Sequence, residues 1–175
     1  MRISLLCILL LFASMSLTQD QSAIAKAKSA CGPDEIRFDF QTTKDSPSVV
    51  EPEPGKARIY VIGRDHRSCG GCGIVARVGL NGAWIGAING NSYLTASLEP
   101  GEHHLCTNWQ SRLSYRNDQI TLANFTAEPG KTYYFRMRLL TQETGPALLD
   151  LDAINSDEGR YLVLTSESSE SHAKK

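Results

Sequence analysis

Three turn signals divide residues 74–107 into four short apolar runs. Asn81-Gly82 follows the first run, Asn89-Gly90 follows the second, and Glu99-Pro100-Gly101 separates the third from the fourth. Asn-Gly accepts the positive φ angles of a type I′ hairpin turn, and Pro-Gly suits the two central positions of a type II turn. This spacing predicts a four-stranded antiparallel meander, and therefore an all-β fold.

The same turn chemistry recurs on either side of the meander. Glu-Pro-Gly also begins at Glu53 and at Glu128, each time just before a run in which the side chains alternate. Apolar residues occupy every second position from 133 to 139, which predicts a strand with one face on the core and the other toward water. We expect residues 119–127 to be the hairpin partner of this strand. Further strands are expected at residues 36–40, 57–62 and 148–153.

The N-terminus has the pattern of an export signal. Arg2 supplies a positive charge, residues 3–13 are an unbroken apolar run, and the small residues that follow suit a cleavage site. A membrane-spanning helix needs about 20 apolar residues, so we expect no transmembrane helix after the signal is removed. Cys7 lies inside the apolar run and not after it, so we expect no lipid anchor. These features predict an exported protein, located in the periplasm or outside the cell.

Length and charge complete the outline of the chain. Its 175 residues carry a formal net charge of −1 with both signs scattered, which disfavours a nucleic-acid partner. We expect an antiparallel β-sandwich, Ig-like or prealbumin-like, with one domain and two tails. The expected boundaries are a signal peptide at 1–18, a flexible segment at 19–33, the β-sandwich at 34–164 and a disordered polar tail at 165–175. Within the domain, Ser156 resembles a helix N-cap, but residues 159–164 suit helix or strand equally.

Export determines how the cysteines are interpreted. Cys7 leaves with the signal, so the mature chain keeps Cys31, Cys69, Cys72 and Cys106. An even number of cysteines in an oxidising compartment favours two disulfides, for which three pairings exist. We prefer Cys69–Cys72 as a local ring and Cys31–Cys106 as a link between the N-terminal segment and the meander. The sequence alone leaves the other pairings open.

Three segments carry a resemblance to a known family. They are GKARIYV from residue 55, LNGAWIGAINGNSYLTASLEPGEHHL from residue 80, and AEPGKTYYFR from residue 127. In this order they resemble the bacterial exported family of unknown function numbered 2846, and the central segment is also similar to PEGA-type β modules. The resemblance implies a small β-sandwich at the bacterial envelope, and it supplies no catalytic residues because the family has no established activity. The CGGC motif at residues 69–72 is not part of the family pattern.

Two chemical alternatives centre on that motif. A redox-active cysteine pair has its first thiol at a helix N-terminus, whereas Cys69 is followed by two glycines that disfavour a helix. Zinc is the other alternative, because His66, Cys69 and Cys72 have the spacing of metal ligands. Export favours oxidised cysteines, so we predict no metal and no cofactor. A metal- or thiol-dependent protein that uses these three residues is kept as the alternative function.

The remaining candidates predict binding and not catalysis. The sequence has no Gly-x-Ser-x-Gly nucleophile elbow, and nothing in it indicates a cleft around its carboxylate pairs, so we expect a non-enzymatic protein. His103 shares a strand face with Leu105, and we expect it to be an inner, hydrogen-bonded histidine. Exposed aromatic and arginine residues are typical of interaction surfaces. The candidate contact residues for an envelope protein or glycan are Trp109, Tyr115, Arg136 and Arg138.

Overall fold

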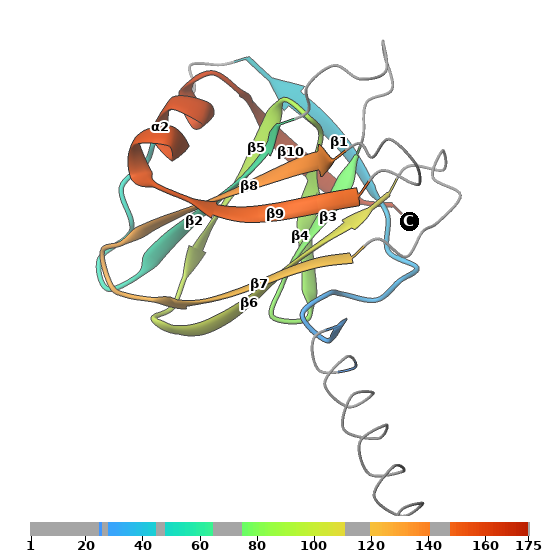
Figure 1. The fold of residues 1–175 in the computed structure, drawn as a ribbon, viewed down its shortest axis with the longest axis horizontal. Helices are drawn as coiled ribbons and strands as arrows, with labels where there is room; N and C mark the ends of the chain where they lie inside the picture. The colour runs from blue at the N-terminus through green and yellow to red at the C-terminus, as the bar shows by residue number, and fades with distance from the viewer. Residues whose placement is uncertain are drawn as a thin grey trace, which may run out of the picture.

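The computed structural model describes residues 25, 28–44, 48–64, 75–110, 120–140 and 148–174. These residues form ten strands and helix α2 (Figure 1). The strands are β1 (Phe38–Thr43), β2 (Ala57–Arg64), β3 (Ala76–Leu80), β4 (Ala83–Ile88), β5 (Ser92–Leu98), β6 (Gly101–Trp109), β7 (Ile120–Ala127), β8 (Thr132–Leu140), β9 (Leu148–Ile154) and β10 (Glu167–Ala173). Helix α2 (Ser156–Leu164) lies between β9 and β10 in the sequence.

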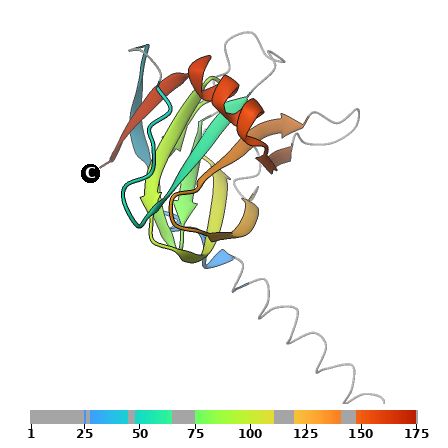
Figure 2. The same cartoon turned by 90° about the vertical axis from the view of Figure 1, so that its left-hand side faces the viewer.

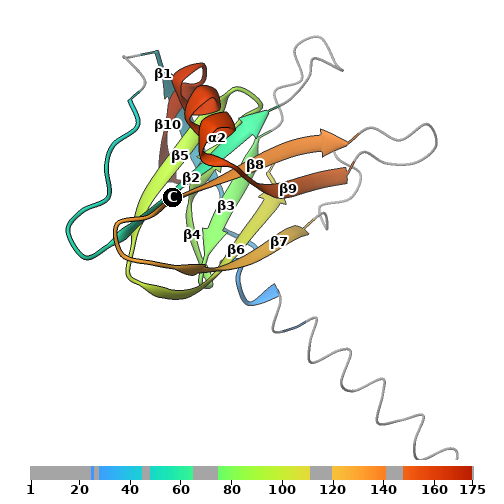
Figure 3. The same ribbon diagram turned by 60° about the vertical axis from the view of Figure 1, so that its left-hand side comes forward.

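The strands are arranged in two sheets, which confirms the expected all-β sandwich. The six-stranded sheet has the order β1-β10-β5-β2-β8-β9, and the four-stranded sheet has the order β4-β3-β6-β7. Neighbouring strands are antiparallel except in the pairs β2–β8 and β10–β5. In Figures 2 and 3, β1 and β10 lie together at one edge of the molecule.

The four strands of the predicted meander exist, but the prediction that they share one sheet is wrong. β3 and β4 pair across Asn81-Gly82, whose φ angles of 52° and 87° are those of a type I′ turn. β5 instead joins the six-stranded sheet, and β6 returns to pair with β3. The chain therefore crosses from one sheet to the other before β5 and back again after it. As a result Leu94 of β5 and Leu105 of β6 enter the same core from opposite sheets, which a meander within one sheet does not allow.

The hairpin expected between residues 119–127 and β8 is also wrong. β7 pairs with β6, whereas β8 pairs with β2 and β9. The turn at Glu128 carries the chain between the sheets and lies beside the equivalent turn at Glu53. Each turn is closed by a backbone hydrogen bond to its glutamate carbonyl, and the Gly130 amide donates to the Lys56 carbonyl at 2.8 Å. The two similar turns therefore lie side by side at the start of two paired parallel strands, β2 and β8.

The main core lies between the sheets, and a second apolar cluster lies under α2. The predicted inner face of β8 is confirmed, because Phe135 and Met137 are buried in the main core. The other face of β8 does not point wholly to water as expected. Tyr134 is buried with Tyr60, Leu162 and other residues of the second cluster, because α2 covers it. In Figure 1 this helix lies on the opposite side of the molecule from β6 and β7.

Residues 159–164, which suited helix or strand equally, belong to helix α2. Its N-cap is Asn155 and not the expected Ser156, since the Asn155 side chain accepts a hydrogen bond from the Glu158 amide at 2.9 Å. Asp157 and Glu158 lie in the first turn, where acidic side chains favour the helix dipole. Among the described residues, no helix has the length and apolar character needed to cross a bilayer.

The prediction of a disordered tail from residue 165 is wrong, because residues 167–173 form β10. This strand pairs along its length with β1 and at its start with β5. Its side chains are polar except that of Ala173 at its end, and two of its serines bind the other sheet. Ser169 and Ser171 donate to the carbonyl of Ala87 in β4, and Ser171 also accepts from the Ala87 amide at 2.9 Å. Backbone pairing and hydroxyl contacts therefore hold a strand that lacks apolar residues to bury.

Candidate binding pocket

Residues 28–37 lie over the outer face of the four-stranded sheet. The disulfide Cys31–Cys106 joins this segment to β6 with its Cα atoms 5.3 Å apart, as preferred from the sequence. The Gly82 amide also donates to the Ala30 carbonyl at 3.0 Å, and Ala30 is buried. Residues 28–33 are therefore held on the sheet, although the sequence predicted flexibility through residue 33. Cys69 and Cys72 lie outside the described residues, so the second disulfide stays a prediction.

Trp84 of β4 is the side chain on which the segment rests. Its indole Nε1 donates to the Pro33 carbonyl at 2.7 Å. A Cβ atom at Gly32 would lie 2.3 Å from the indole ring, so only glycine allows the chain to approach this closely. The tryptophan and the glycine together fix the path of the segment from the disulfide toward β1.

Arg77 of β3 lies beneath the segment and is only 2% exposed. Its Nη1 donates to the carbonyls of Asp34 at 3.0 Å and Ile36 at 2.6 Å. The guanidinium carbon also lies 4.2 Å from the centre of the Trp84 ring, at cation–π distance. Burial is the main cause that lowers the pKa of Arg77, and the nearby charge of Arg37 lowers it further.

A pocket of about 450 Å³ opens between the segment and the sheet. Residues 28–37 contribute one wall through several side chains, and the other wall comes from Arg77, Asn108, Trp109 and Ile120. This volume is in the range of about 300–1,000 Å³ that is typical of small-molecule sites. Cys31 also lines the pocket, so the disulfide holds one of the pocket's own lining residues on the sheet.

Three residues that line the pocket each have one buried polar side-chain atom with no hydrogen-bond partner among the described residues. These atoms are Arg77 Nε, Asn108 Oδ1 and Trp109 Nε1. An unpartnered buried polar atom costs about 1–3 kcal/mol, so a native fold rarely keeps several in one place. These three do not converge on one point, because Asn108 and Trp109 are neighbours on β6 and their side chains point to opposite faces of the sheet.

The pocket is positively charged. Among the described residues that line it, Lys28, Arg37 and Arg77 are cations and Asp34 is the single carboxylate. Arg37 Nη1 donates to backbone carbonyls of Asp34 and Ile36, as Arg77 does. Across the described ranges, neither guanidinium has a carboxylate within ion-pair distance. An anion is therefore the ligand that this wall favours electrostatically.

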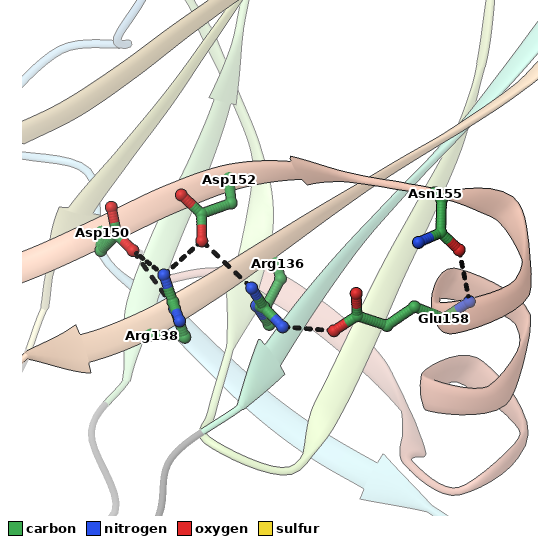
Figure 4. Close-up of polar contacts among 6 residues, drawn as sticks. All are labelled: Arg136, Arg138, Asp150, Asp152, Asn155 and Glu158. Atoms are coloured by element: carbon green, nitrogen blue, oxygen red, sulfur yellow. Dashed lines mark hydrogen bonds and ion pairs between the residues drawn. The ribbon is translucent and has the colours of Figure 1, made fainter.

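A second polar cluster links β8, β9 and α2 (Figure 4). Arg136 pairs with Asp152 at 3.2 Å and with Glu158, and Arg138 pairs with Asp150 at 2.6 Å and with Asp152. Three carboxylates thus surround two guanidiniums. The two arginines expected to contact a partner have their charges balanced within the fold, where they connect two strands to the helix.

The other predicted site residues divide between the core and the undescribed parts of the chain. Trp109 is half-buried and packs against the main core, although the sequence suggested an exposed contact. His103 is buried and hydrogen-bonded, as predicted, with Nδ1 2.8 Å from the Asn81 amide nitrogen and Nε2 2.7 Å from the Glu99 carbonyl. The described residues contain no group of three or more possible metal ligands. Tyr115 and the zinc candidates at 66, 69 and 72 lie outside the described residues.

Sequence reasoning missed Arg77 and Asn108, the two buried polar residues of the pocket. One signal was present, because Arg77 interrupts the apolar run IVARVGL at a position where a solvated or paired charge is expected. No sequence pattern indicates that residues 28–37 cover this position, since the contact depends on the disulfide and on the path of a segment without regular structure.

The fold and the pocket define a class of protein: a disulfide-linked β-sandwich with a cationic pocket on the outer face of its smaller sheet. The chain belongs to the family described as "Protein of unknown function (DUF2846)", which matches residues 53–147, more than half of its 175 residues. The match includes the β3 and β6 wall of the pocket but not the segment at 28–37. Comparisons with curated proteins and with solved structures give no significant match. The similarity to PEGA-type modules stays a prediction.

Proposed function

We propose that this protein is an exported, non-enzymatic β-sandwich module that binds a ligand or partner at the cell envelope. The observation that carries the proposal is the pocket under residues 28–37. It offers positive charge and hydrogen-bond donors on a rigid sheet, which suits binding. The N-terminal export pattern supports a periplasmic or extracellular location. The Cys31–Cys106 disulfide agrees with it, because such bonds persist mainly in oxidising compartments.

Export and cysteine state are tested together on the full chain produced in a bacterium with a periplasm. We expect a shortened protein in the periplasm or medium, whose intact mass rises by about 2 Da per disulfide on reduction. Two disulfides give twice that shift. An unprocessed cytoplasmic protein would contradict the proposal. Free thiols at Cys69 and Cys72 with bound zinc would favour the metal- or thiol-dependent alternative.

The binding role is tested with the purified mature protein and isolated envelope fractions. We expect saturable retention of the protein by membranes, cell-wall material or envelope glycans. The variant Arg37→Gln, which removes one pocket cation, weakens retention, whereas Arg160→Gln on the exposed face of α2 makes the same charge change outside the pocket. Equal retention of both variants would place the binding surface elsewhere, and no retention of the parent protein would refute the binding role.

A further inference from the structure

The hydrogen bonds around the buried side chain of His103 determine its protonation state. Its Nε2 lies 2.7 Å from the Glu99 carbonyl oxygen, which can only accept, so Nε2 carries a proton. Its Nδ1 lies 2.8 Å from the side-chain nitrogen of Asn81, and the Asn81 Oδ1 accepts from the backbone N–H of His104 at 2.9 Å. Because this N–H can only donate, the Asn81 amide has one orientation and its nitrogen donates to Nδ1. The His103 ring is therefore neutral.

The surroundings of the ring offer no charge that would balance a second proton. Within the described part of the chain, no carboxylate lies within ion-pair distance of the His103 ring. From β7 the ring meets Phe125, with the two ring centroids 5.7 Å apart. The charged side chains nearest in the sequence have other partners: Glu99 lies 3.5 Å from Lys56, and Glu102 lies 3.6 Å from His104. Glu102 and His104 also point to the opposite face of β6 from His103.

A second proton on His103 breaks one of these hydrogen bonds. Nδ1–H then faces the N–H groups of the Asn81 amide, and two donors cannot bond each other. Rotation of the amide would give Nδ1–H an acceptor, but it would take the acceptor away from the backbone N–H of His104. Either arrangement leaves a donor without a partner, which favours release of the Asn81 side chain from β6.

The turn that contains Asn81 also holds one end of the pocket wall. The Gly82 amide donates to the Ala30 carbonyl at 3.0 Å. Because Cys31 stays fixed by its disulfide, movement of the turn releases only the part of the wall that precedes it. That part includes Lys28, one of the cations that line the pocket.

We infer that His103, Asn81 and Gly82 form a pH-sensitive latch on the pocket wall. Neutral His103 keeps Asn81 on β6 and Ala30 on the turn, and acidification through the range in which histidine takes up a proton, from about pH 8 to about pH 5, releases both. The latch is a property of the fold, whereas its control of binding rests on the proposed function. Release moves Lys28 away from the pocket, so the pocket holds an anionic partner less tightly at acidic pH.

Hydrogen–deuterium exchange of the Gly82 amide, followed by NMR on the purified protein, measures the latch directly, because this amide donates to Ala30. We expect its protection factor to fall by about tenfold or more between about pH 8 and about pH 5, a factor that corresponds to one unsatisfied buried donor. At the higher pH, the ¹⁵N signals of the His103 ring show a proton on Nε2 and none on Nδ1. Retention of the protein by envelope fractions falls over the same pH interval.

The variant Asn81→Asp is expected to remove or reverse this pH dependence. A carboxylate accepts from the His104 N–H and from a protonated Nδ1 at once, so Gly82 is protected at acidic pH at least as well as at about pH 8. Aspartate also tolerates the φ angle of 52° at this position. Asn89→Asp is the matched control in the second Asn-Gly turn, where the side-chain oxygen accepts from the Asn91 amide, and it behaves like the parent protein. His104→Gln removes the more exposed histidine of β6 and also leaves the pH dependence unchanged.

Four outcomes would contradict parts of this account. Equal protection of the Gly82 amide at both pH values, or a proton on Nδ1 of His103 at the higher pH, would overturn the latch. Acid-induced loss of protection that persists in Asn81→Asp would assign the change to another group and would also overturn it. Loss of protection at acidic pH with unchanged retention would overturn its control of binding. A pH-dependent Gly82 amide without retention at either pH would refute the proposed function and leave the latch standing.

Discussion

Arg77 connects the sheet, the covering segment and the pocket through one side chain. Its Nη1 donates to two carbonyls of residues 28–37, its guanidinium lies at cation–π distance from Trp84, and the residue is among those that line the pocket. Within the part of the chain that the structure describes, no carboxylate pairs with this buried charge, and such a charge is costly, which argues for a role beyond stability. Other single residues have purely structural roles, and Gly159 and Tyr134 allow this to be tested.

Replacing Gly159 with alanine is expected to destabilise the protein. Helix propensity alone favours alanine by about 1 kcal/mol. A Cβ atom at this position would, however, lie 2.2 Å from Cγ of Tyr134, so α2 must move off its cluster. Overpacking of this kind costs about 1–3 kcal/mol, so the net change in urea unfolding is a loss of up to about 2 kcal/mol. A gain in stability would show that α2 packs less closely on Tyr134.

The same tyrosine gives the protein a pH dependence at the alkaline end. Desolvation raises the pKa of Tyr134, and the neighbouring Tyr60 raises it further. In the unfolded chain this tyrosine ionises near pH 10, whereas in the folded protein it keeps its proton to a higher pH. The folded state therefore has its full stability below about pH 10 and loses stability as the pH rises through the folded-state pKa. We expect the unfolding free energy to fall above about pH 10, and Tyr134→Phe to make that fall shallower. Tyr161→Phe, at an exposed position of α2, is the control.

At the scale of elements, β10 and residues 28–37 bury few apolar side chains and are attached to the four-stranded sheet by other contacts. Serine hydroxyl groups of β10 bind Ala87 in β4, and the disulfide holds residues 28–37 on the four-stranded sheet. The ion-pair network of Arg136 and Arg138 similarly joins β9 and α2 to β8. Hydrophobic patterning does not reveal such attachments, because the residues that make them are polar.

The disulfide prediction belongs to this scale. Cys31→Ser combined with Cys106→Ser is expected to lower the unfolding free energy by about 2–5 kcal/mol, since the bond closes a loop with a sequence separation of 75. Loss of the tether also frees one wall of the pocket, so retention by envelope fractions falls in the same variant. Unchanged melting and unchanged retention together would mean that the disulfide neither stabilises the fold nor shapes the pocket.

At the scale of the whole molecule, local chemistry predicts the strands but not their sheets. The type I′ turn at Asn81-Gly82 and the inner face of β8 follow from residue type and alternation, and both are found. Whether the chain pairs again or crosses to the other sheet after a turn depends on packing between distant strands. The pocket is less predictable still, because residues 28–37 meet Arg77 and Asn108 only in the folded protein.

The pocket between residues 28–37 and the four-stranded sheet is the proposed binding site. The most direct measurement compares the retention of the mature protein, Arg37→Gln and Arg160→Gln by isolated envelope fractions. We predict weaker retention for Arg37→Gln and parent-like retention for Arg160→Gln. Equal retention of the two variants, or no retention of the parent protein, would contradict a binding site in this pocket.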